Sequence, residues 1–112
     1  MPSTKHLEIL EKGVEFWNEW RKNNPREIPN LKQAVLIDKE WDEINFSDAK
    51  LQGADLALSD LSNSNLRNAK TWKTIFRNVI FQDADLRGIE VDKSFRDDIV
   101  GKPKYWPEEE GD

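Results

Sequence analysis

The sequence predicts an all-β solenoid, and three observations lead to that fold class. An apolar residue recurs at every fifth position from Leu31 to Val91, with Thr71 as the exception. A second set of residues, two positions earlier in each unit, is mostly small. The 112-residue chain is 37% hydrophobic, which is low for a globular core but sufficient for the narrow interior of a solenoid.

The five-residue period predicts a coil with four sides. Residues two apart in an extended segment point to the same side, so Ala54 and Leu56 can face inward while Asp55 faces outward. The remaining residues of the unit, Ala57 and Leu58, must then turn the chain. Four such units close one coil, and coils stack at about 4.8 Å. The predicted core column consists of Leu36, Trp41, Phe46, Leu51, Leu56, Leu61, Leu66, Phe76, Phe81 and Leu86.

The repeated unit resembles that of the pentapeptide-repeat family, which reads A(D/N)LXX. The units that carry this resemblance are AKLQG, ADLAL, SDLSN, SNLRN and ADLRG. The resemblance covers roughly residues 29–95 and implies a right-handed quadrilateral β-helix of about three coils. Residues 13–31 are similar to the leader that precedes the repeats in many bacterial members. The pattern departs from the family's at Lys39, Trp41, Ile44, Thr71, Thr74 and Val79.

The chain divides into three predicted regions: a capping helix and linker over residues 1–30, the pentapeptide-repeat β-helix over residues 31–99, and an acidic tail over residues 100–112. One α-helix is expected over residues 4–23, because Ser3 or Thr4 can cap it and Pro25 prevents its continuation. The apolar stripe expected to cover the first coil consists of Leu7, Leu10, Val14 and Trp17. His6 is expected to be a solvated helix residue.

Exposed apolar side chains give the candidate interaction residues. Trp72, Ile75 and Ile80 fall at outward positions of the third coil, and such a patch needs a cover. Tyr105 and Trp106 of the tail could fold back onto it, or a second copy or a distinct partner could cover it. A second stripe of the N-terminal helix, which includes Ile9, Phe16 and Trp20, is either buried in the monomer or a partner surface.

Residues for catalysis and metal binding are scarce. The chain has no cysteine and one histidine, so no thiolate site, histidine–cysteine metal cluster or catalytic triad is expected. We therefore expect no enzymatic activity, catalytic residue, cofactor, metal or small-molecule substrate. The net charge of −5 argues against a nucleic-acid partner. No apolar run predicts a signal peptide or membrane span, so we expect a cytoplasmic protein without a membrane partner.

The leading hypothesis for function is a non-catalytic structural or protein-interaction module, whose partner is another protein or a second copy. The family resemblance implies an alternative, a DNA-mimic inhibitor or protector of type II topoisomerase (DNA gyrase). Such mimicry needs a long acidic rod, whereas three coils rise only about 15 Å. The basic residues clustered in the middle of the chain are Arg67, Lys70, Lys73 and Arg77.

Overall fold

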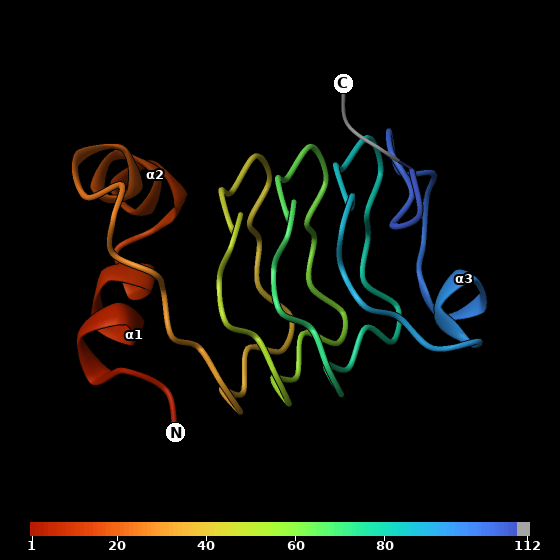
Figure 1. Ribbon diagram of the computed structural model, residues 1–112, viewed down its shortest axis with the longest axis horizontal. Helices are drawn as coiled ribbons and strands as arrows, with labels where there is room; N and C mark the ends of the chain where they lie inside the picture. Colours follow the sequence, from red (N-terminus) through yellow and green to blue (C-terminus); the bar gives the residue numbers. More distant parts are fainter. Residues whose placement is uncertain (110–112) are drawn as a thin grey trace.

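The computed structural model describes residues 1–109 and consists of a coiled region with helices at its two ends. Helices α1 (Thr4–Glu11) and α2 (Val14–Asn23) precede the coil, and the short helix α3 (Phe95–Asp98) lies within its last part. Figure 1 shows α1 and α2 together at the first end of the stack of coils, and α3 at the opposite end. Among these residues, no helix is long and apolar enough to cross a membrane.

Parallel bridges between residues 20 apart hold successive coils together. In one such column, Asn30 bridges Lys50, which in turn bridges Lys70. The N–H of Lys50 donates to the carbonyl of Pro29 at 2.8 Å, and the N–H of Leu31 donates to the carbonyl of Lys50 at 2.8 Å. Columns of bridges also start at Val35, Glu40 and Asn45, so the coil has four sides. Each bridge is a single residue, and the described part of the chain contains no continuous strand.

A tight turn with a left-handed residue ends each side of the coil. In the unit from Leu51, the N–H of Ala54 donates to the carbonyl of Leu51 at 2.9 Å, and Gly53 has φ 72°. A positive φ at the third residue is the mark of a type II turn. Of the twelve such positions between residues 33 and 88, eight carry Gly, Asn or Asp, which tolerate this conformation best. Leu58, with φ 68°, is the apolar exception.

The predicted core column lies inside the coil. None of its residues is more than 6% exposed, and Thr71 is buried in the same column. Lys39, in contrast, is exposed at a position of the small inward set. The Ser59 hydroxyl from the next coil fills this turn, since it accepts from the Lys39 N–H at 3.0 Å and donates to the Leu36 carbonyl at 2.9 Å. A buried hydroxyl thus replaces the turn's own hydrogen bond.

The prediction of a single N-terminal helix is wrong, because the helix is broken at Gly13. This residue has φ 102°, a conformation that favours glycine and ends α1. The break redirects the chain so that Leu10 of α1 and Trp17 of α2 are both buried. Leu7 and Val14 are partly buried against the same core.

His6 is buried rather than solvated, with 6% of its surface exposed. Its Nδ1 accepts a hydrogen bond from the Asn30 N–H at 2.8 Å. The proton therefore lies on Nε2, which donates to Glu27 Oε2 at 2.8 Å. The His6 ring also packs on Trp20, with 5.2 Å between ring centroids. Because these partners are distant in sequence, the residues next to His6 did not predict its burial.

The ladder extends beyond residue 99, into the segment for which the sequence predicted a separate tail. Val100 bridges Ile80, and Tyr105 bridges Asp85, so these residues form two sides of a fourth coil. Residues 90–98 form no bridge of the ladder, and the last four of them form α3 (Figure 1). In the five-residue register Arg96 would point inward, where burial of an unpaired guanidinium is costly. Phe95 fills the interior instead, and its ring centroid lies 5.3 Å from that of Phe76.

Candidate interaction surface

The fourth coil is incomplete, and the third coil therefore keeps an open edge. Within residues 1–109, the N–H groups of Lys73 and Phe76 and the carbonyl of Thr74 have no hydrogen-bond partner. One coil earlier the equivalent groups are paired. There the N–H of Gly53 donates to Trp72 at 2.9 Å, and the N–H of Leu56 donates to Ile75 at 3.0 Å.

Thr71 marks the place where the chain leaves the ladder. Its hydroxyl donates to the Glu90 carbonyl at 2.7 Å and accepts from the Glu90 N–H at 3.0 Å. A side chain thus makes bonds that backbone groups make elsewhere in the ladder. This explains why a polar residue stands in the apolar column. Together, Thr71 and the in-phase Arg96 were the sequence signals that could have located the open edge.

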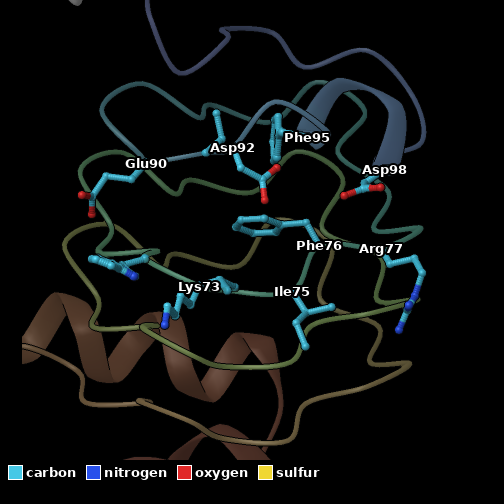
Figure 2. A pocket seen from close by; sticks show the side chains of 11 residues that line it. Lys73, Ile75, Phe76, Arg77, Glu90, Asp92, Phe95 and Asp98 are labelled. Atoms are coloured by element: carbon cyan, nitrogen blue, oxygen red, sulfur yellow. The ribbon is translucent and has the colours of Figure 1, made fainter.

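A pocket of about 560 Å³ lies between the open edge and the segment that left the ladder. Figure 2 shows Lys73, Ile75 and Arg77 on one side of the Phe76 ring, and Glu90, Asp92, Phe95 and Asp98 on the other. Apolar side chains are exposed around it. Trp72 is 56% exposed, Ile75 40% and Val91 41%.

Tyr105 and Trp106 do not cover this patch, although the sequence allowed it. The Tyr105 ring lies 4.0 Å from the guanidinium of Arg87, which is also bonded to Asp85. The Trp106 ring lies 3.9 Å from the guanidinium of Arg96. Ile80 is only partly exposed and bridges Val100. The structure thus separates Trp72 and Ile75 from the other C-terminal candidates.

The charged side chains on the two walls of the pocket differ in whether they have bonding partners. Asp92 accepts from the Ser94 N–H at 3.0 Å and hydroxyl at 2.8 Å, and Asp98 accepts from the same hydroxyl at 3.0 Å. Lys73 and Arg77 on the coil wall are exposed and form no ion pair within residues 1–109. The Arg77 guanidinium is therefore available to a bound molecule, whereas the Lys73 ammonium lies over the Trp72 ring, 5.7 Å from its centroid.

The N-terminal candidates lie at the other end of the molecule. Trp20 packs on His6 and on Trp17, whose ring centroid is 5.3 Å away. Phe16 is 47% exposed, beneath the ammonium of Lys12 at 4.6 Å. A second cavity, of about 470 Å³, lies between α1 and the first coil and borders the exposed Val35. Val35 was not among the interaction residues predicted from sequence.

The described residues contain no group of three or more histidine, cysteine, aspartate or glutamate side chains that could hold a metal ion. The C-terminal end of the coil has unpaired backbone groups beside apolar and basic side chains.

The family model for pentapeptide repeats matches residues 30–63 and 59–94 with eight copies.

The chain belongs to the pentapeptide-repeat family. No curated protein matches it. The match to pentapeptide repeats ends at residue 94, immediately before α3 begins at Phe95. In this pentapeptide-repeat protein the candidate surface therefore lies where the last matched repeat gives way to a different local structure.

Proposed function

We propose that this pentapeptide-repeat protein is a non-catalytic interaction module, which binds another protein at the C-terminal end of its coil. The observation that carries the proposal is the open edge of the third coil. Trp72 and Ile75 are exposed beside unpaired backbone groups of Lys73 and Phe76. Aromatic and aliphatic side chains around a pocket are typical anchors of protein interfaces.

A pull-down from the native host with matched variants tests this proposal. Wild-type protein is expected to retain a partner, and Ile75→Asp is expected to lose it because a carboxylate then replaces an apolar contact. Leu58→Asn is the control, since Leu58 is 54% exposed and its side chain does not line the pocket. Circular dichroism checks that each variant is folded. A partner retained equally by all three proteins would contradict the proposal.

Self-association is tested separately by sedimentation velocity of the purified protein. We expect a monomer across the accessible concentration range, because the proposed occupant of the surface is a different protein. A dimer that Ile75→Asp dissociates would assign the surface to a second copy instead.

The DNA-mimic alternative gains no support from the arrangement of charges. Lys50 and Lys70 occupy successive positions in one outward column, where mimicry of a phosphate backbone would need acids. The described molecule measures 33 × 31 × 21 Å, so it has no long rod-like axis. We therefore do not propose that function.

A further inference from the structure

We infer that one side of the coil, which carries lysines and no acidic residue, binds a row of carboxylates on an acidic partner protein. This lysine side consists of residues 30–33, 50–53 and 70–73, which follow one another in successive coils. The inference rests on the proposed function and specifies the chemistry of the partner, because Trp72 belongs both to the lysine side and to the C-terminal pocket.

Charged residues are divided between opposite sides of the coil. The columns of bridges that start at Asn30 and Glu40 belong to opposite sides of the four. The lysine side carries four lysines and no acid, namely Lys32, Lys50, Lys70 and Lys73. The opposite side, residues 40–43, 60–63 and 80–83, carries five acids and no base, namely Glu40, Asp42, Glu43, Asp60 and Asp83. A chain with a net charge of −5 therefore has a basic surface on one side.

The ammonium groups of the lysine side are available to anions. Those of Lys32, Lys50 and Lys70 form no ion pair or hydrogen bond within residues 1–109. The Lys73 ammonium lies over the Trp72 ring. Lys50 and Lys70 bridge each other on successive coils, so their backbones lie about 4.8 Å apart. Their like charges repel each other, and a carboxylate bound between them relieves that repulsion.

Acidic residues of this protein lie at the margins of the lysine side. Glu90 follows Lys70 by one coil, beyond the last bridge of that column. Figure 2 shows Glu90 on the opposite side of the Phe76 ring from Lys73, with the other carboxylates of the pocket. Asp48 stands at the preceding corner, where its charge acts on Arg21. These acids border the lysine side and do not interrupt it.

The distribution of charge and apolar surface favours a protein as the partner. A nucleic acid is a long polyanion, which the net charge of −5 repels outside the lysine side. A polybasic patch without a second anchor holds a protein only weakly on an anionic membrane. A protein can present a few carboxylates to the lysines and an apolar residue to Trp72, which is 56% exposed.

An acidic peptide tests the inference directly. The probe is acetyl-Glu-Ser-Glu-Ser-Glu-amide, titrated into isotopically labelled protein at about 50 mM salt and followed by amide chemical shifts. We expect saturable shifts at the amides of Lys50 and Lys70. Glutamine in place of the three glutamates should weaken binding at least about tenfold. Raising the salt to about 200 mM should weaken binding of the glutamate peptide at least about threefold.

Charge-reversal variants locate the binding surface. Lys50→Glu combined with Lys70→Glu should weaken binding of the glutamate peptide at least about tenfold. The matched control combines Lys22→Glu with Lys102→Glu, which changes the net charge equally beside the acidic side and should weaken binding less than about threefold. Lys22 lines a pocket with Asp42 and Glu43, and the Lys102 carbonyl accepts from the N–H of Asp83. Circular dichroism checks that each variant is folded.

Three outcomes would overturn the inference. One is the absence of saturable shifts up to about 5 mM peptide. Another is an equal loss of affinity in the two double variants. The third is tighter binding of octauridylate or of phosphatidylserine vesicles than of the peptide, because a nucleic acid or a membrane would then be the occupant. The proposed function is judged separately, because the pull-down depends on Ile75 and the peptide titration depends on the lysine side.

Discussion

The two ends of the coil differ in how many of their exposed backbone groups have hydrogen-bond partners. Any open-ended stack of coils has unpaired backbone groups at its first and last coil. At the first coil, side chains from the helices bond several of these groups. At the third coil, two sides remain open because residues 90–98 leave the ladder.

The N-terminal cap uses side-chain donors and acceptors in place of a preceding coil. The Trp17 indole N–H donates to the carbonyl of Asn45 at 2.8 Å, and Arg21 Nη1 donates to the same oxygen at 2.9 Å. Arg21 Nη2 donates to Ser47 at 2.8 Å. The Asn45 N–H donates to the side chain of Asn18 at 2.8 Å. Burial lowers the pKa of Arg21, which is opposed in part by Asp48.

Helices close an edge by fixing polar side chains against it, whereas an excursion of the chain leaves main-chain groups available. The first arrangement favours stability. The second leaves exposed the groups on which the proposed interaction depends. Variants at each end can test this division.

Trp17→Ala should have the largest effect. Trp17 is 0% exposed, contacts Phe46 with 5.7 Å between ring centroids, and bonds the edge. Its truncation should lower the free energy of unfolding by about 3–5 kcal/mol, measured by urea denaturation. Phe16→Ala, on the exposed face of the same helix, should cost less than about 1 kcal/mol. Similar losses for both would mean that the cap is held by general packing rather than by Trp17.

Arg21→Met should have the next largest effect. The methionine keeps much of the apolar stem but leaves the Ser47 carbonyl without its donor, so we expect a loss of about 1–3 kcal/mol. Lys22→Met removes a neighbouring charge that is exposed, and should change stability by less than about 0.5 kcal/mol. If the two variants were equally stable, bonds from Arg21 would not be what closes the edge.

Leu58→Asn should stabilise the protein slightly, away from both ends. Leu58 adopts φ 68°, which asparagine tolerates better, and the side chain is 54% exposed. We expect a gain of about 0.5 kcal/mol by the same denaturation measurement. Val35→Asn removes an exposed apolar side chain at a residue without positive φ, and should give no gain. A gain at both positions would mean that replacing an exposed apolar side chain, and not relief of backbone strain, stabilises the protein.

The smallest effect concerns pH at the N-terminal cap. Hydrogen bonds from His6 and then Lys5 lower the pKa of Glu27, although burial opposes the shift. A lowered pKa in the folded state means that stability is present above the unfolded value and is lost as pH falls through the folded value. Wild type should therefore lose more stability than Glu27→Gln between about pH 5 and pH 2.5. Denaturation at several pH values checks this.

The matched control is Glu19→Gln, since Glu19 is exposed and its carboxylate has no ion-pair partner within residues 1–109. Its stability should follow that of wild type across the same pH range. A parallel decline for wild type and Glu27→Gln would show that the Glu27 contacts do not stabilise the cap.

The repeating part of the fold was accessible from sequence because each unit carries its own signal. Leu61 faces inward for the same local reason as Leu56 and Leu66, and the turn residues follow at a fixed distance. Belonging to the family was likewise readable from these units. Local periodicity was therefore enough to predict both the column and the ladder.

Features that depend on contacts between distant residues were not accessible in this way. The burial of His6 depends on Glu27 and Asn30, which lie more than one coil's length away in sequence. The open edge depends on the excursion of residues 90–98, where the charged Arg96 stands at a position that the five-residue register would turn inward. Exposed Trp72 and Ile75 were predicted as interaction residues, but their separation from Tyr105 and Trp106 required the structure.

Because the chain returns to its register after α3, a protein of this kind can change in length by whole coils. Val100 still bridges Ile80, 20 residues before it, as if the excursion had not occurred. An inserted block of 20 residues between the second and third coils would therefore leave both ends unaltered and lengthen the stack by about 4.8 Å. The distance between the N-terminal cap and the open edge can therefore change in discrete steps, each produced by duplication of one block of 20 residues.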